Sequence, residues 1–71
     1  MTRPVETPRD PRVDPKPGDV LRKGKRVRTV LVVSKVFNRV TYTTASGIET
    51  HVLLSYWADW ADNAEVLNAA D

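Results

Sequence analysis

The chain has 71 residues, of which eleven are basic, nine are acidic and none is cysteine. A domain this small buries only roughly 60% of its unfolded surface, which excludes a large enclosed active site, and the lack of cysteine excludes disulfide bonds, thiolate metal sites and a cysteine nucleophile. All eleven bases precede Val40 together with four acids, so this part carries a net charge of +7, whereas the remainder has five acids and no base and carries −5; this separation predicts an oriented electric field.

No segment has the composition of a membrane span or a signal peptide. The longest apolar run is the four residues Val30 to Val33, whereas a spanning helix needs roughly 20 apolar residues. The first ten residues lack the apolar segment of a signal peptide. We therefore expect a cytoplasmic protein without membrane contact.

The N-terminal part of the chain is rich in proline. All five prolines lie in the first seventeen residues, interleaved with charges and few apolar residues. Such a segment cannot bury enough surface to order itself, so residues 1–16 are expected to form a flexible tail and residues 17–71 a single domain. A turn at Pro17 and Gly18 leads into a short strand over 19–22, and Gly24 marks the tip of a hairpin because glycine takes positive φ without steric cost.

Three further strands are predicted from the patterns that follow. Residues 26–36 are rich in β-branched residues, and their four central apolar residues indicate either cover on both faces or a bend. After a turn near Phe37 and Asn38, residues 39–44 alternate in polarity and predict a half-buried strand, with Val40, Tyr42 and Thr44 on one face. Residues 45–47 then predict a hairpin loop with a left-handed Gly47, and residues 48–54 a fourth strand.

The periodicity changes to that of a helix after the fourth strand. Ser55 is a candidate N-cap for this helix. Its inner face is expected to consist of four residues at offsets 0, 4, 7 and 11: Leu53, Trp57, Trp60 and Ala64. Trp57 is expected to be structural because so small a core needs its area, whereas Tyr56 points off that face and is expected to be exposed. Residues 64–68 are expected to form a fifth strand, with an extension of the helix as the alternative.

This order of elements resembles that of a Src-homology-3-like barrel. Residues 17–23, PGDVLRK, are similar to the opening strand of KOW-type small barrels, where a glycine and an acid precede an apolar pair. Residues 39–57, RVTYTTASGIETHVLLSYW, are similar to the third and fourth strands of such barrels and the short helix after them. The layout also resembles that of small barrel proteins encoded by bacteriophages and prophages, which would act in the cytoplasm of a bacterial host.

The resemblance covers residues 17–68 and implies a mainly β fold, a small five-stranded Src-homology-3-like barrel with one short helix before the last strand. The glycine-centred motif of KOW modules is only approximated by Gly18 and Gly24, so a ribosomal or transcription-elongation function does not follow. The aromatic groove with which Src-homology-3 domains bind polyproline has no counterpart among the aromatic residues of this chain.

Basic residues are concentrated around the predicted first hairpin, with five bases in the seven positions from Arg22 to Arg28. Clustered cations gain affinity for nucleic acid by releasing its condensed counterions. The leading hypothesis is a non-enzymatic binding module that docks on DNA or RNA without sequence preference, or on a nucleoprotein complex. The predicted nucleic-acid-binding residues are Arg22, Lys23, Lys25, Arg26, Arg28, Lys35 and Arg39. The alternative is a solubilising hairpin that balances the acidic C-terminal part.

A second hypothesis assigns the acidic and aromatic C-terminal face to a protein partner. The chain would then inhibit or modulate a host enzyme or defence complex, using its separated charges for oriented docking. The predicted partner-binding residues are Tyr56, Asp59, Trp60 and Asp62. A third hypothesis is a structural component that oligomerises head to tail, with basic face on acidic face.

No constellation of residues predicts catalysis, a metal site or a cofactor. His51 is the only histidine and has neither a nucleophile nor a second metal ligand near it in the sequence. The acids Asp59, Asp62 and Glu65 follow one another at intervals of three, which is typical of a solvated acidic helix face. The sequence therefore predicts a protein that is not an enzyme.

Overall fold

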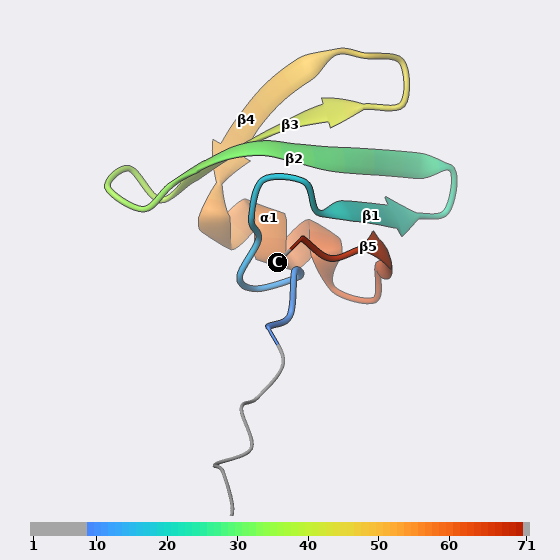
Figure 1. Cartoon of the computed structure of the whole chain (residues 1–71), viewed down its shortest axis with the longest axis horizontal. Coiled ribbons are helices and arrows are strands. Elements are labelled where there is room, and N and C mark those ends of the chain that lie inside the picture. Colours follow the sequence, from blue (N-terminus) through green and yellow to red (C-terminus); the bar gives the residue numbers. More distant parts are fainter. Residues whose placement is uncertain (1–8, 71) are drawn as a thin grey trace, which may run out of the picture.

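The computed structural model describes residues 9–70. In this part, five antiparallel strands form one sheet in the order β4-β3-β2-β1-β5, and a helix precedes the last strand (Figure 1). The elements are β1 (Val20–Lys23), β2 (Arg26–Ser34), β3 (Arg39–Thr44), β4 (Glu49–Leu53), α1 (Leu54–Ala61) and β5 (Glu65–Asn68). The predicted mainly β fold with a fifth strand after the helix is confirmed. Because β4 and β5 are the two edges of an unclosed sheet, the barrel and the Src-homology-3-like assignment stay predictions.

The predicted turns occur where glycine or asparagine permits a left-handed backbone. Lys23 pairs with Arg26, so Gly24 and Lys25 form a two-residue hairpin turn. Gly24 has φ 63°, and a positive φ at the first central position is typical of a type II′ turn. Gly47 in the loop between β3 and β4 has φ 87°, and Asn38 between β2 and β3 has φ 51°.

Strand β2 bends in its middle, as its four apolar residues predict. The pairing of β2 with β3 shifts between Val30 and Val32, which leaves Leu31 as an extra residue. Val30 and Val33 consequently pack on the core, whereas Leu31 is 37% and Val32 is 56% exposed. The apolar run is therefore explained by the bend and not by cover on both faces.

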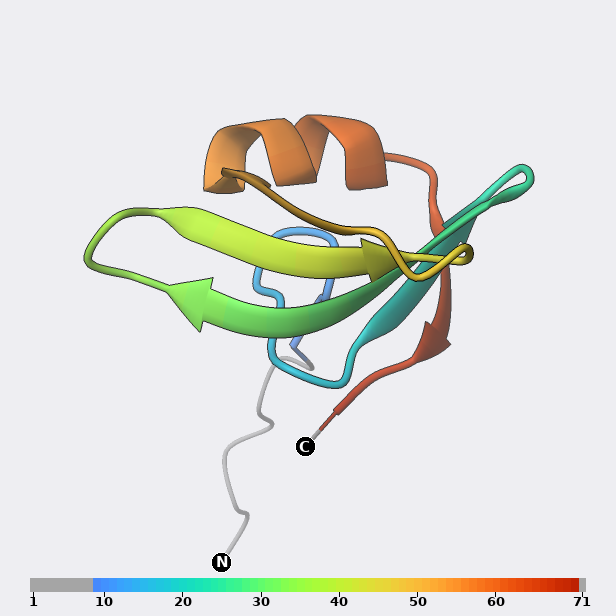
Figure 2. The ribbon, with the colours of Figure 1, turned by 90° about the horizontal axis from the view of Figure 1, so that it is seen from above.

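The core lies between one face of the sheet and α1, which lies across that face (Figure 2). Trp57 has no exposed surface, and its ring centroid lies 5.7 Å from that of Tyr42 and 5.6 Å from that of Trp60. The structural role predicted for Trp57 is thus confirmed. The core cluster of the described part consists of Leu21, Val30, Val40, Tyr42, Trp57, Ala61 and Ala64.

The helical face predicted from the sequence is only partly correct. Trp57 and Trp60 both belong to the core region, but Leu53 precedes the helix and is 50% exposed. Ala64 is buried beyond the last helical residue, Ala61. The helix is shorter than the pattern suggests because the chain must turn back after Ala61 to place β5 beside β1.

The predicted N-cap at Ser55 is wrong. The helix begins at Leu54, and no side chain caps its start. The N–H of Leu54 instead donates to the carbonyl oxygen of Asn38 at 2.7 Å, so the ladder between β4 and β3 continues into the first helical residue. At eight residues, α1 is too short to cross a membrane, and residues 9–70 contain no other helix that would do so.

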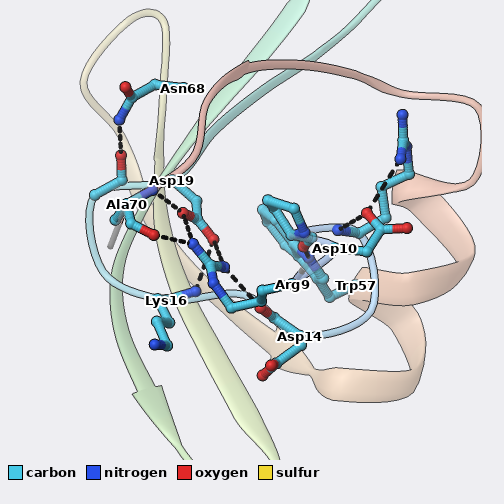
Figure 3. Close-up of polar contacts among 11 residues, drawn as sticks. Arg9, Asp10, Asp14, Lys16, Asp19, Trp57, Asn68 and Ala70 are labelled. Atoms are coloured by element: carbon cyan, nitrogen blue, oxygen red, sulfur yellow. Dashed lines mark hydrogen bonds and ion pairs between the residues drawn. The ribbon is translucent and has the colours of Figure 1, made fainter. Parts of the chain in front are cut away.

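The N-terminal segment packs on the domain from residue 9 onward, which corrects the predicted flexible tail over 9–16. Pro11 and Pro15 are buried. The Nε1–H of Trp57 donates to the carbonyl oxygen of Pro11 at 3.1 Å (Figure 3), and Nε of Arg12 donates to that of Ala64 at 2.9 Å. A proline-rich segment can dock in this way because its fixed φ leaves less backbone entropy to lose. The rest of the predicted tail, residues 1–8, lies outside the described residues.

The carboxylate of Asp19 anchors this segment although it is completely buried. It accepts hydrogen bonds from both Nη atoms of Arg9, at 2.5 and 2.9 Å, and from the N–H groups of Lys16 at 2.8 Å and Ala70 at 2.6 Å (Figure 3). Burial raises the pKa of Asp19, but these hydrogen bonds and the charge of Arg9 outweigh it, so the pKa lies below its ordinary value of 3.8. Asp19 therefore joins the N-terminal segment to both the start of β1 and the C-terminal end.

Candidate functional site

The turn between β1 and β2 and the loop between β3 and β4 lie at the same end of the sheet (Figure 1). A groove of about 390 Å³ lies between them, where Arg28 on β2 pairs with Thr44 on β3. Three of its lining residues are basic and none is acidic. We call this site the basic groove, and its lining residues are Lys25, Arg26, Val27, Arg28, Thr44, Ala45 and Ser46.

Arg28 is held in the basic groove by two aromatic rings. Its guanidinium carbon lies 4.3 Å from the ring centroid of Tyr42 and 4.0 Å from that of Trp60, which are favourable cation–π distances. Burial lowers the pKa of Arg28, and nearby Arg26 adds to this against an opposing effect of Tyr42, yet a guanidinium remains charged at neutral pH. The result is a cation whose position is set by two rings.

The N–H donors of Arg28 are not used within the described part of the chain. Its guanidinium makes no hydrogen bond or ion pair with any residue of 9–70. In the same residues, every buried side-chain nitrogen or oxygen has a hydrogen-bond partner, so the unpartnered nitrogens of Arg28 reach solvent. Arg28 thus offers a fixed, charged and accessible set of donors, the arrangement that binds phosphate or carboxylate.

The two supporting rings come from distant parts of the chain, and the sequence patterns alone do not place them in this groove. The alternation of β3 places Tyr42 on the core face, where it is only 5% exposed. Trp60 comes from α1 and packs beside Trp57. The alternation of polarity in each strand predicts that Arg28 and Tyr42 each point to the core face. It does not predict which residues of β2 and β3 lie opposite each other, so their proximity could not be predicted from the sequence.

The other bases of the first hairpin differ in what they contact. Lys25 and Arg26 are exposed and make no hydrogen bond or ion pair with residues 9–70. Arg22 forms an ion pair with Glu65. Lys23 donates from Nζ to the carbonyl oxygen of Trp60 at 2.9 Å, near the end of α1 where the helix dipole favours a cation. Lys25 and Arg26 are therefore exposed cations that, like Arg28, have no ion pair within the described part of the chain.

Lys35 and Arg39 do not join the basic groove. Lys35 follows the other end of β2, nine residues from Arg26, which is about 30 Å along an extended strand. Arg39 lies over the ring of Phe37 at 5.3 Å. It lines a different groove of about 510 Å³, with Phe37, His51, Val52, Leu53 and Tyr56. The seven predicted residues thus divide between two ends of the sheet.

The predicted partner-binding face is smaller than expected. Tyr56 is 64% exposed, as predicted, and Asp59 and Asp62 are exposed as well. Trp60 does not belong with them, because its ring contacts Trp57 and the guanidinium of Arg28. This face therefore combines one exposed aromatic ring with two carboxylates.

Residues 9–70 contain no group of three or more acidic or histidine side chains that could hold a metal ion. Comparison of the chain with protein-family models, with curated proteins and with solved structures gives no match. The basic groove is therefore the feature of the molecule from which a function can be inferred.

Proposed function

We propose that this protein is a non-enzymatic binding module of the Src-homology-3-like type that holds the phosphate backbone of nucleic acid in its basic groove. The strand order, the bend in β2 and the helix before the last strand support the fold assignment. The observation that carries the functional proposal is Arg28, which lies between two rings with accessible and unused N–H donors.

The basic groove suits a phosphodiester for three physical reasons. A guanidinium matches two phosphate oxygens with parallel N–H donors. Because the rings of Tyr42 and Trp60 already hold Arg28, less side-chain entropy is lost when an anion binds. Lys25 and Arg26 add charge at the rim without competition from an acidic lining residue.

The same groove predicts binding without sequence preference. Tyr42 is buried, and the guanidinium of Arg28 covers Trp60, so neither ring is free to stack on a base. Contacts to phosphate position a protein on nucleic acid but carry no sequence information. A phage or prophage origin, and a host nucleoprotein complex as the physiological partner, stay predictions from the sequence layout.

Fluorescence anisotropy with labelled single-stranded DNA, duplex DNA and RNA of equal length, at two salt concentrations, tests the proposal. Lys25→Glu is expected to weaken binding at least tenfold and to reduce the slope of log K against log salt by about 0.9 for each lost phosphate contact to duplex DNA. Lys35→Glu is the matched control, because it makes the same charge change about 30 Å away. At physiological salt, screening over about 8 Å should leave its affinity near that of the wild type.

Two outcomes would contradict the proposal. Equal losses in the two variants would mean that binding follows net charge and not the basic groove. No binding of any of the three nucleic acids at low salt would exclude phosphate as the ligand. If binding is found, the nucleic acid that binds most tightly of the three identifies the physiological class.

A protein partner is the second candidate, favoured by the exposed ring of Tyr56 beside the exposed carboxylate of Asp59. Exposed aromatic residues dominate the binding energy of many interfaces. If this candidate is correct, the wild type should capture a protein from a bacterial lysate. The Tyr56→Ala and Asp59→Lys variants should no longer capture that protein, whereas Lys25→Glu should still do so. The opposite pattern would exclude this candidate.

A further inference from the structure

Strand β4 is an edge of the sheet with its outer backbone groups free. Within residues 9–70 it pairs on one side only, with β3. The N–H of Thr44 donates to the carbonyl oxygen of Ile48 at 2.9 Å, and that of Leu54 to Asn38 at 2.7 Å. Bonded positions alternate in an antiparallel pair, so residues 48, 50, 52 and 54 bond to β3. The N–H and C=O groups of residues 49 and 51 therefore point to the open edge, as does the N–H of Leu53. The C=O of Leu53, the N-cap residue of α1, accepts the first hydrogen bond of the helix.

This edge carries few of the features that usually prevent strand pairing. Proteins protect free edges with charged side chains, above all lysine, with proline or with a bulge. Strand β4 contains no lysine or proline, its one carboxylate is Glu49, and its pairing with β3 has no register shift. Large exposed apolar side chains lie in this strand or next to it: Ile48 is 61%, Leu53 is 50%, Tyr56 is 64% and Phe37 is 65% exposed. The edge is therefore suited to receive another strand.

We propose that the occupant is β4 of a second copy of this chain, paired antiparallel about a two-fold axis at His51. Glu49 then lies opposite Leu53 of the second copy, and the two His51 residues lie opposite each other. The two His51 residues exchange both of their backbone hydrogen bonds. On either side of them, the N–H of Leu53 donates to the carbonyl oxygen of Glu49 of the other copy. The two sheets become one continuous sheet through an isologous contact.

Charge complementarity supports this register. Arg39, Leu53 and Glu49 lie on the sheet face opposite α1, because β3 directs Val40 and Tyr42 to the core. Arg39 pairs with Leu53 inside one copy, and Glu49 of the second copy would lie on the other side of Leu53. Two strand spacings separate the two Cα atoms by about 10 Å, which the side chains of Arg39 and Glu49 can bridge. The two-fold axis repeats this ion pair on the other side.

Other registers fit less well. Centring the axis on Glu49 would place two carboxylates opposite each other, which is destabilising. Centring it on Leu53 would require pairing partners beyond this residue, where the chain is already helical. Centring it on Thr50 or Val52 would also pair outward-pointing backbone groups, but it would move Glu49 of the second copy out of the row of Leu53 and Arg39 and leave both charges unpaired. The axis at His51 is thus the arrangement that uses the free groups and also pairs the charges.

Sedimentation equilibrium over a range of protein concentrations tests the pairing, with His51→Lys, Arg39→Glu, Glu49→Arg and the double variant Arg39→Glu/Glu49→Arg. The wild type is expected to approach twice the monomer mass of 8.0 kDa. His51→Lys puts two ammonium groups at the axis and should give a monomer. Each single charge reversal affects two symmetric ion pairs and should weaken the dimer about tenfold, and the double variant should restore it.

The double variant is decisive because the two residues are not neighbours within one copy. Arg39 pairs with Leu53 and Glu49 pairs with Thr43, so they are separated by four residues along the strands, about 13 Å. Restoration must therefore come from pairing between copies. A monomer at every concentration would overturn the proposal, as would a mass that grows without limit, which indicates edge-to-edge chains from β4 to β5. Failure of the double variant to restore the dimer would overturn the register.

The dimer is independent of the proposed phosphate binding. Lys25 and Arg26 lie two strands away from the β4 edge, so Lys25→Glu should leave the dimer mass unchanged. Conversely, the monomeric His51→Lys variant retains the whole basic groove. The two experiments can thus fail separately.

Discussion

Arg9 and Asp19 form a two-point ion pair, with Nη1 of Arg9 2.5 Å from Oδ2 and Nη2 2.9 Å from Oδ1 of Asp19. The Asp19 side chain is completely buried, and that of Arg9 is 15% exposed. A buried charge is tolerated when it is paired and its other lone pairs accept hydrogen bonds. The N–H groups of Lys16 and Ala70 meet this requirement. The pair therefore fixes a segment whose composition is typical of disorder.

Asp19→Asn is expected to lower the free energy of unfolding by roughly 2 to 4 kcal/mol, because it leaves the charge of Arg9 without its carboxylate. Urea unfolding followed by tryptophan fluorescence measures this change. Asp10→Asn is the matched control: Asp10 pairs with Arg12 at 3.1 Å, but both side chains are about 40% exposed, so its loss should cost less than about 1 kcal/mol. Similar losses in both variants would contradict the role assigned to Asp19.

The same carboxylate makes stability depend on pH. Its pKa in the folded protein lies below the ordinary value of 3.8, so folding favours the charged form. This stabilisation is complete above pH 3.8 and is lost as the pH falls through the lower folded pKa. Acid titration should therefore destabilise the wild type more steeply below pH 4 than Asp19→Asn, which lacks this group. Parallel curves for the two proteins would exclude Asp19 as the cause of acid sensitivity.

Deletion of residues 1–16 is expected to destabilise the domain by more than about 3 kcal/mol, because it removes the partner of buried Asp19 and uncovers Trp57. The tryptophan emission should also shift to longer wavelength as water reaches the indole ring. Deletion of residues 1–8 is the control, since it keeps Arg9, Pro11 and Arg12 in place. An unchanged unfolding midpoint after the longer deletion would show that the segment contributes nothing to stability.

The sequence predicts those features that depend on local patterns. Alternation places Val40 and Tyr42 on the core face, and Gly24 and Gly47 mark turns because only a positive φ closes them. The N-terminal segment was mispredicted because its contacts are long-range. Pro11 meets Trp57 46 positions away, and no pattern within the segment reports that partner. The composition of a segment indicates whether it can form a core of its own. It does not indicate whether the segment packs against a core formed by other residues.

For the candidate site, as for the fold, local features could be predicted from the sequence and long-range contacts could not. Five clustered bases predict a charged hairpin, but their partners depend on strand register and on where α1 ends. Arg22 meets Glu65 because β1 pairs with β5, and Lys23 meets Trp60 because the helix ends beside the hairpin. The sequence therefore indicates how much charge the hairpin carries. Only the three-dimensional arrangement distinguishes Arg28 from its neighbours.

Gly18→Ala should cost more stability than Gly24→Ala. Gly18 has φ 98°, and an added Cβ would lie 3.3 Å from the Cβ of Ala70. Gly24 has φ 63°, with no atom within 4 Å of an added Cβ. The strain of a left-handed alanine is about 1 to 2 kcal/mol, so Gly24→Ala should stay in that range and Gly18→Ala should exceed it. Thermal unfolding of both variants measures the difference, and the reverse order would contradict the packing of Gly18 against the C-terminal end.

Trp60→Leu is expected to weaken nucleic-acid binding about two- to fivefold, the loss equivalent to a cation–π contact of roughly 0.5 to 1 kcal/mol. The ring of Trp60 lies 4.0 Å from the guanidinium carbon of Arg28, and without it only the ring of Tyr42 holds Arg28 before the ligand binds. Trp60→Phe keeps an aromatic surface and should bind more tightly than Trp60→Leu.

Anisotropy titrations of the two Trp60 variants at one salt concentration measure this effect, at a temperature where circular dichroism shows that both are folded. The salt dependence should be the same in both, because neither substitution changes a charge. Arg28→Gln is the reference for complete loss of the contact, and it should lower both the affinity and the salt slope. If Trp60→Leu binds as tightly as the wild type while Arg28→Gln does not, Arg28 binds phosphate without needing the ring. Its position between Tyr42 and Trp60 would then serve the core alone.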